Sequence, residues 1–193
     1  VIPTVAPYLL PEVLPAVRRA FPELRLRLHE EHTDVLLARL DRGELDLALL
    51  ALEAPLGDVE QLPLFRDPFV VALARSHPLA KRKAVSLRDI AGAEVLLLED
   101  GHCLRDQALE VCRRAGAAEA GDFRAGSLAT LIQMVVGGMG VTLLPSLCVE
   151  SETRRERGLA ACRLRRPVPF RTIGLVWRRT SPRGDSFRRL AAA

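Results

Sequence analysis

The sequence has few of the features that mark secreted, membrane or zinc-binding proteins. Its 193 residues include four cysteines, too few for a disulfide scaffold, and their spacing fits no zinc finger or ribbon. We therefore expect no metal site. The first residues lack the basic start and apolar core of a signal peptide, so we expect a cytoplasmic protein with reduced thiols. Because the sequence does not begin with methionine, we also expect a fragment of a longer protein.

Signals for a membrane span, a cofactor or an enzyme are equally scarce. The uncharged stretch 127–149 is long enough to cross a bilayer, but Gln133, a group of glycines and Pro145 interrupt it. It is better interpreted as a helix, a glycine turn and a buried strand. The glycine group at 137–140 lacks the Lys-Ser/Thr of a P-loop and does not match GxGxxG. No Ser-His-Asp or paired-carboxylate arrangement follows from spacing, and we expect no cofactor.

Lysine is scarce, and most of the positive charge comes from arginine. The two lysines are Lys81 and Lys83, and the formal net charge is +4. The cations are spread along the chain, with local groups at 81–83 and 163–166. A DNA-binding surface usually combines clustered basic residues with a recognition motif, so the charge alone does not argue for DNA binding.

Apolar residues, 49% of the chain, follow an alternation of helices and strands. Helical spacing over 10–21 precedes a strictly alternating segment, 24–28, which predicts a strand with one buried face. Thr33 or Asp34 can cap a helix that ends near Gly43. The almost continuous apolar run 45–52 predicts a strand of a parallel sheet. Together these elements predict a βαβ unit in the first 52 residues.

A second group of elements follows without a flexible linker or an internal repeat. The two groups indicate two α/β lobes, whose usual ligand site is the crevice between them at the carboxyl ends of strands. The predicted strands of the second group are 69–74, 94–98, 141–144, 159–164 and 171–177. Its predicted helices start at Ser86, Cys103, Ser127 and just after Pro182, and the helix from Cys103 should run to Ala115 and end at Gly116.

The segment around Cys103 carries the strongest chemical signal. Cys103 follows a glycine turn at the start of a predicted helix, where the helix dipole and unpaired N–H groups favour a thiolate. A thiolate is the form that peroxide oxidises. Cys112 lies nine residues further on, about 13.5 Å along a continuous helix and on its other side. A disulfide between them requires the helix to unwind, which is what a redox switch requires.

The cysteines also have a plain structural interpretation. Cysteine in an apolar stretch is often a small core residue, and we expect this of Cys148 and Cys162. For Cys112 the two interpretations are evenly balanced. Spacing and composition therefore support a possible thiol switch and leave core filling open.

The run from Glu99 to Gln107, together with Cys112 nine residues after Cys103, resembles the redox motif of peroxide-sensing transcription regulators of the LysR family. Further segments match that family in the same order: 4–11, 43–48, 77–80, 138–145 and 171–176. The resemblance implies two Rossmann-like α/β lobes of the periplasmic-binding-protein type 2 kind. Lobe I would comprise 1–66 and 171–193, and lobe II, 67–170, would carry the redox cysteines.

The resemblance also implies roles for particular residues. Cys103 would be the peroxidatic cysteine and Cys112 the resolving one, and their disulfide would remodel the domain and switch transcription activation. The residues lining the peroxide pocket would be Thr4, Thr33, His102, Arg105, Asp106 and Arg171.

The implied partners are hydrogen peroxide, further copies of the chain and cytosolic thiol reductants such as glutaredoxin or thioredoxin. The DNA-binding domain of the family is missing from this sequence. Promoter DNA, RNA polymerase and the tetramer would therefore belong to the full-length protein, and no membrane is involved. Two rival functions stay open: a LysR effector domain that binds a small anion between its lobes, and a thiol peroxidase.

Overall fold

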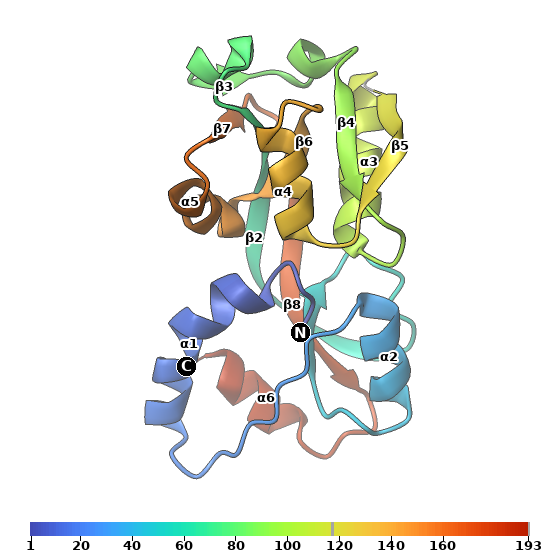
Figure 1. Ribbon diagram of the computed structural model, residues 1–193. Coiled ribbons are helices and arrows are strands. Elements are labelled where there is room, and N and C mark those ends of the chain that lie inside the picture. Colours follow the sequence, from blue (N-terminus) through green and yellow to red (C-terminus); the bar gives the residue numbers. More distant parts are fainter. Residues whose placement is uncertain (117, 193) are drawn as a thin grey trace. The chain divides into compact units, whose positions relative to one another are not determined.

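The computed structural model describes residues 1–116 and 118–192 (Figure 1). The chain divides into two compact units. Unit 1 comprises Val1–Arg66 and Arg171–Ala193, and unit 2 comprises Asp67–Phe170. The chain therefore leaves unit 1 once, completes unit 2 without interruption, and returns to unit 1 for its last segment.

Unit 1 is built around an antiparallel strand pair. β1 (Ala48–Ala51) pairs antiparallel with β8 (Phe170–Arg178), which also neighbours β2 (Val59–Ala74) in the strand order. The strands approach closely at Gly174, where a Cβ atom would lie 2.8 Å from the carbonyl oxygen of Leu62. Glycine is therefore required at this position.

Three helices complete unit 1. α2 (Thr33–Asp41) packs against β1 through a buried face that includes Leu36 and Leu40. α1 (Ala6–Ala20) precedes it in the chain, and α6 (Gly184–Ala191) follows β8. The single buried side chain of α6, Phe187, lies 5.5 Å from the ring of Trp177, which anchors the helix to β8.

The main sheet of unit 2 is formed by the second part of β2 and its neighbours. β6 (Thr142–Pro145) and β7 (Leu159–Leu164) both pair antiparallel with β2. β3 (Ala84–Val85) pairs parallel with β7. Residues 69–74 of β2 are all buried because they lie between two strands in the centre of this sheet.

A second, two-stranded sheet positions the cysteine-bearing helix. β4 (Glu94–Leu98) and β5 (Ala118–Ala125) pair in parallel, and a further bridge joins Val95 to Val141. α3 (Cys103–Ala115) and α4 (Leu128–Val136) pack against both strands. The apolar run of β4, from Val95 to Leu98, is at most 2% exposed, which fits a strand covered on both faces.

Short elements connect these parts of unit 2. They are η1 (Pro78–Lys81), η2 (Leu87–Ile90) and α5 (Ser146–Arg155). η2 packs against α3 and begins with a capping box in which Ser86 and Asp89 satisfy each other's backbone N–H groups. None of the helices in the described part of the chain is both long and apolar enough to cross a membrane.

The strand predicted at 24–28 is wrong, and with it the βαβ unit. The segment belongs to no strand, and Leu24, Leu26 and Leu28 are 42–48% exposed. Alternation produces a strand only where a neighbour supplies backbone partners and buries one face, and no described strand lies beside this segment. β1 pairs antiparallel with β8 instead of parallel with 24–28.

Several other predictions are confirmed. β4 and β7 have the predicted limits, and β6 and β8 each differ from the predicted strands by one residue at both ends. α4 follows Ser127, whose hydroxyl accepts a hydrogen bond from the N–H of Thr130 as a cap should. α2 begins at Thr33 with His32 as its N-cap, so neither expected residue caps it. Sequence reasoning missed β5 and α5, and β2 is ten residues longer at its start than the predicted strand 69–74.

Candidate functional site

Helix α3 has the predicted limits, Cys103 to Ala115. Gly101 turns the chain with φ of 96°, and His102 is the N-cap residue in an extended conformation. Gly116 ends the helix in the left-handed region, with φ of 69°. The two glycines supply backbone conformations that other residues rarely adopt. They fix Cys103 as the first helical residue, at the positive end of the helix dipole.

The two cysteines of α3 have different surroundings. Cys103 is half-buried, whereas Cys112 is 1% exposed, and neither forms a disulfide. Burial raises the pKa of the Cys112 thiol to about 11. At neutral pH Cys112 is therefore a protonated core residue. While the helix is intact, the separation between Cys103 and Cys112 prevents a disulfide between them.

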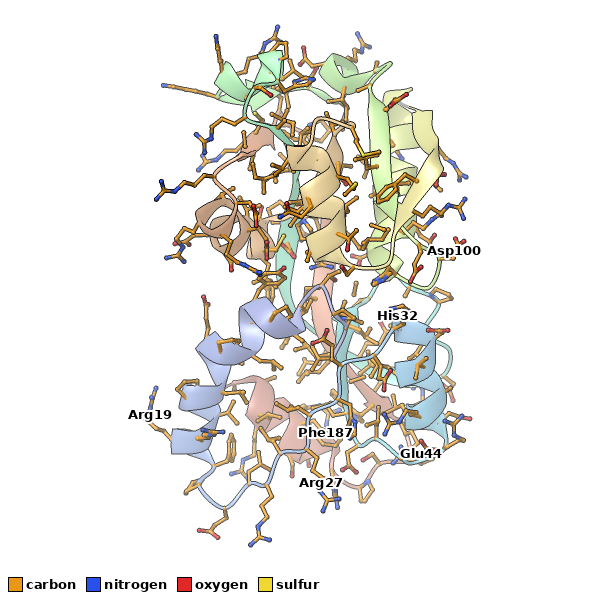
Figure 2. All side chains as sticks on the ribbon, viewed as in Figure 1. Arg19, Arg27, His32, Glu44, Asp100 and Phe187 are labelled. Carbon is orange, nitrogen blue, oxygen red and sulfur yellow. The ribbon has the colours of Figure 1, made fainter. Side chains whose placement is uncertain are left out.

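An ion-pair cluster, here called the Arg105 cluster, joins the start of α3 to β5. The guanidinium of Arg105 contacts Glu119 at 3.0 Å, Asp100 at 3.4 Å and Asp106 at 3.6 Å. Arg124 contacts Asp100 at 2.8 Å and Glu119 at 3.4 Å. The side chain of Arg105 is 8% exposed and lies at the centre, whereas Asp100, labelled in Figure 2, is at the exposed rim.

This cluster changes the interpretation of Arg105. The sequence suggested a cation whose donors are available to a ligand or to the Cys103 thiolate. In the structure the guanidinium is shared among three carboxylates, so its positive charge is largely compensated locally. Sequence reasoning missed Glu119 and Arg124. Both lie on β5, which follows α3 in the chain, and no spacing rule predicts that this strand returns to the start of the helix.

In unit 1, Arg171 and Thr4 are in direct contact. Arg171 is fully buried and donates hydrogen bonds to the Thr4 hydroxyl at 2.7 Å and to the Thr4 carbonyl at 3.1 Å. Thr33, at the start of α2, is 7% exposed, and its hydroxyl makes no hydrogen bond with the described residues. A buried hydroxyl without a partner is costly, so this group is suited to a small polar ligand.

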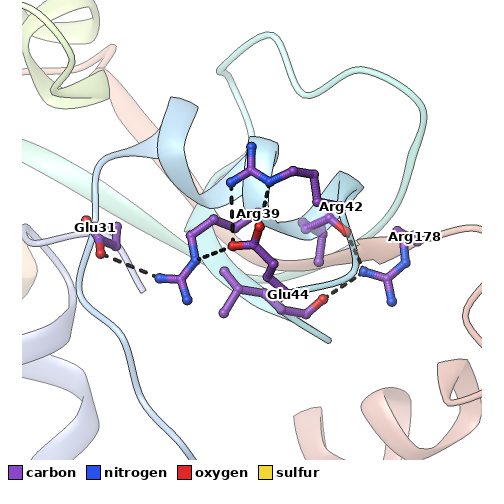
Figure 3. A network of polar contacts seen from close by, with 7 residues as sticks. Glu31, Arg39, Arg42, Glu44 and Arg178 are labelled. Atoms are coloured by element: carbon purple, nitrogen blue, oxygen red, sulfur yellow. Dashed lines mark hydrogen bonds and ion pairs between the residues drawn. The ribbon is translucent and has the colours of Figure 1, made fainter.

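A second ion-pair cluster, here called the Glu44 cluster, holds both ends of α2 (Figure 3). Arg39 contacts Glu31 before the helix at 3.5 Å and Glu44 after it at 3.3 Å. Arg42 contacts Glu44 at 2.6 Å. Arg178 of β8 donates hydrogen bonds to the carbonyls of Leu40 and Leu45. The cluster thereby positions α2 and its first residue, Thr33.

The predicted site residues thus fall into two sets. His102, Cys103, Arg105 and Asp106 lie together at the start of α3, and His102 is 6% exposed. Thr4, Thr33 and Arg171 belong to unit 1. Cys148 and Cys162 are buried in unit 2, where their thiols donate to the carbonyls of Pro145 and Leu79.

Other parts of the described chain are weaker candidates for a functional site. A cavity of about 260 Å³ lies between α4 and α5, and none of the predicted site residues lines it. No group of three or more His, Cys, Asp or Glu residues suited to a metal ion occurs among the described residues. The start of α3 is therefore the part of unit 2 where reactive and charged groups gather.

The chain matches a known family over its whole length. A family model described as the LysR substrate binding domain covers residues 1–193. The hydrogen peroxide-inducible genes activator of Escherichia coli O6:H1 is 48% identical over 192 residues, covering 100% of this chain and 63% of that relative. The crystal structure of the reduced form of OxyR has a TM-score of 0.89 and 46% identity, over 99% of this chain and 89% of that one. The crystal structure of the oxidised form of OxyR has a TM-score of 0.88 and 48% identity, over 99% of this chain and 90% of that one.

Proposed function

Because the chain belongs to the LysR substrate-binding domain family, with its two-lobed α/β fold, we propose that it is the redox-sensing domain of a hydrogen-peroxide-responsive transcription regulator. The chain spans 63% of the length of this curated relative. One observation carries the proposal: α3 begins with a half-exposed cysteine and buries a second one.

The first step is oxidation of Cys103. Its thiolate, favoured by the positive end of the α3 dipole, attacks one oxygen of hydrogen peroxide. The O–O bond breaks, a sulfenic acid forms on Cys103, and the other oxygen leaves as water after taking up a proton. The half-buried position of Cys103 allows so small an oxidant to reach it.

The second step requires Cys112 to leave the core. Its thiol attacks the sulfenic sulfur, the S–O bond breaks, and a second water leaves as the disulfide forms. Since the two residues lie about 13.5 Å apart along the helix axis, α3 must unwind for this bond to form. The chemical signal thus becomes a change in the shape of unit 2. A dithiol reductant of the thioredoxin or glutaredoxin kind reverses it by thiol–disulfide exchange.

The other residues that the family resemblance implies also have proposed roles. His102 and Asp106 flank Cys103 and Arg105 on the chain at the start of α3, where they can orient peroxide and the thiolate. In unit 1 the Thr4 hydroxyl is held by Arg171, and the Thr33 hydroxyl is available to a peroxide oxygen. Hydroxyl and guanidinium groups match the hydrogen-bonding needs of peroxide or of the water that replaces it.

The proposal also sets the domain's partners. In the full-length protein a DNA-binding domain would contact promoter DNA, and the remodelled domain would change the arrangement of a homodimer or tetramer and the contact with RNA polymerase. Such a regulator works in the cytoplasm, where DNA and thiol reductants are present. Because peroxide is consumed once per switching event, we assign no enzyme activity to the chain.

Peptide mapping by mass spectrometry after a brief, near-stoichiometric peroxide pulse tests the function. We expect a Cys103–Cys112 disulfide in the native chain and a trapped sulfenic acid on Cys103 in Cys112→Ser. Cys148→Ser serves as the matched control, because that thiol is also buried in unit 2, and it should leave the disulfide unchanged. If peroxide leaves both α3 thiols untouched, the proposal fails and a small-anion effector domain becomes the better interpretation.

A further inference from the structure

The fold brings together two basic segments that are eighty residues apart in the chain. β3 and β7 pair in parallel, with Ala84 opposite Arg163. The N–H of Arg165 donates to the carbonyl of Val85 at 2.8 Å, and the Cys162 thiol donates to the carbonyl of Leu79 at 3.3 Å. Neighbouring strands lie about 4.8 Å apart. The lysines before β3 therefore lie beside the arginines at the end of β7.

We call this region the basic surface. It consists of Lys81, Arg82, Lys83, Arg163, Arg165 and Arg166, all exposed. Val85 and Leu164 point inward and are buried, which leaves the charged side chains on the outer side of the two strands. Around β3 in Figure 1, the stick view in Figure 2 shows long side chains with nitrogen at their tips pointing outward.

The charge of the basic surface is hardly compensated. Arg82 contacts Asp89 at 2.8 Å, whereas the other five cations make no ion pair with the described residues. By contrast, both arginines of the Arg105 cluster, and Arg39 and Arg42 of the Glu44 cluster, contact at least one carboxylate each. A group of like charges without local counterions attracts a polyanion and releases that partner's counterions on binding.

The composition of the surface indicates which polyanion fits. Protein interfaces usually have an apolar core with aromatic anchors, and none of the large apolar side chains exposed in the described chain lies within 81–85 or 163–166. Contacts to a nucleic-acid backbone need cations at exposed positions and no apolar anchor. We propose that the basic surface binds the phosphate backbone of duplex DNA without sequence preference.

This inference goes beyond the redox function and rests on it in one respect, because a transcription regulator places the domain beside promoter DNA. The sequence alone did not suggest it, since its two basic groups looked separate. The basic surface would add weak contacts, without sequence preference, to those of a DNA-binding domain. The chemistry of Cys103 and Cys112 is not involved.

Fluorescence anisotropy with a labelled mixed-sequence duplex tests the inference on the 193-residue chain under reducing conditions. The patch variant combines Lys81→Gln, Lys83→Gln, Arg163→Gln and Arg165→Gln. The control variant combines Arg18→Gln, Arg19→Gln, Arg25→Gln and Arg27→Gln, which removes the same charge from exposed positions of unit 1. A third variant exchanges lysine and arginine at the four patch positions and keeps the charge.

For the native chain we expect binding at low salt that weakens steeply as salt rises. The patch variant should bind about tenfold more weakly or worse at low salt, and its slope of log affinity against log salt should be shallower by about 3.6, because four cations are removed at about 0.9 each. The control and the charge-conserving variants should stay close to the native chain. A second duplex of unrelated sequence should bind equally well.

Three outcomes would overturn the inference. One is no binding to the duplex at low salt, and another is an equal loss in the control variant, which would mean that net charge alone is responsible. The third is an acidic peptide that competes as well as the duplex, which would assign the surface to a protein partner. Since every measurement uses the reduced chain, none of these results bears on the disulfide, and a failed peroxide test would leave this inference standing.

Discussion

The Arg105 cluster of unit 2 and the Glu44 cluster of unit 1 use the same chemistry in different surroundings. Each joins arginines to carboxylates from neighbouring elements, with contacts between 2.6 and 3.6 Å. The central residue of the first, Arg105, has a side chain 8% exposed, whereas that of the second, Glu44, is 46% exposed. Distances alone therefore cannot rank their contributions to stability.

Burial decides the difference. In water an ion pair gains little, because solvent and salt screen both charges. A buried charge has lost its hydration, so removing its partners leaves a large penalty. The start of α3, where Cys103 lies, should therefore be tightly held in the reduced state, while the ends of α2 are held mainly by hydrogen bonds and packing. A switch needs such a well-defined starting state.

The largest effect should come from the centre of the Arg105 cluster. Arg105→Gln takes the buried cation away from Glu119, whose side chain is only 23% exposed, and should lower the free energy of unfolding by about 2 kcal/mol. Urea unfolding of the reduced chain measures this. Arg124→Gln is the matched control, because Arg124 shares Asp100 and Glu119 but is 46% exposed, and it should cost less than about 1 kcal/mol. Equal costs would show that burial does not separate the two arginines.

The next largest effect on stability should come from Cys112, an uncharged side chain that stabilises α3 because it is buried. Cys112→Ala should lower the free energy of unfolding by about 1 to 2 kcal/mol at neutral pH, because it leaves a small cavity. Burial raises the thiol pKa from its ordinary value of 9.0 to about 11, so the native chain holds this proton more tightly than the unfolded chain. The thiol's contribution is therefore complete below pH 9 and is lost as pH rises to 11.

Urea unfolding at several pH values, with reductant present, tests this pH dependence. The advantage of the native chain over Cys112→Ala should shrink by about 2 kcal/mol across that window. Cys148→Ala provides the control for loss of a buried thiol elsewhere in unit 2. A constant difference between the native chain and Cys112→Ala up to pH 11 would contradict the raised pKa.

These comparisons also show how far sequence reasoning reached. α3 was predictable because the glycine turn before Cys103 and Gly116 at the other end are local signals that mark its limits. The absence of a strand at 24–28 was not predictable. An alternating segment forms a strand only beside a second strand, and alternation does not show whether one is present. The predicted fold class is confirmed by the family match, although the βαβ unit on which part of that prediction rested does not form.

The candidate site was predictable to a similar degree. The two cysteines lie on one helix, so local spacing finds them, whereas Arg105 was implied by the family resemblance. The carboxylates that hold Arg105 include Glu119 on β5, and only the parallel pairing of β4 with β5 brings it near. The basic surface arises in the same way, from the pairing of β3 with β7. Contacts between paired strands far apart in the chain leave no local signal.

The smallest effect on stability should come from Arg42 in the Glu44 cluster. The hydrogen bond from Arg42 holds the pKa of Glu44 below its ordinary value of 4.5, with Arg39 adding to the effect. This exposed pair contributes above pH 4.5, and its contribution is lost as pH falls through the lowered pKa. Arg42→Gln should therefore move the Glu44 pKa upward toward 4.5 in an NMR titration of its carboxyl carbon, with Arg18→Gln as a control that leaves it unchanged. At neutral pH the urea midpoint should not move measurably. A loss comparable to that of Arg105→Gln would mean that exposed networks hold α2 as firmly as the buried cation holds α3.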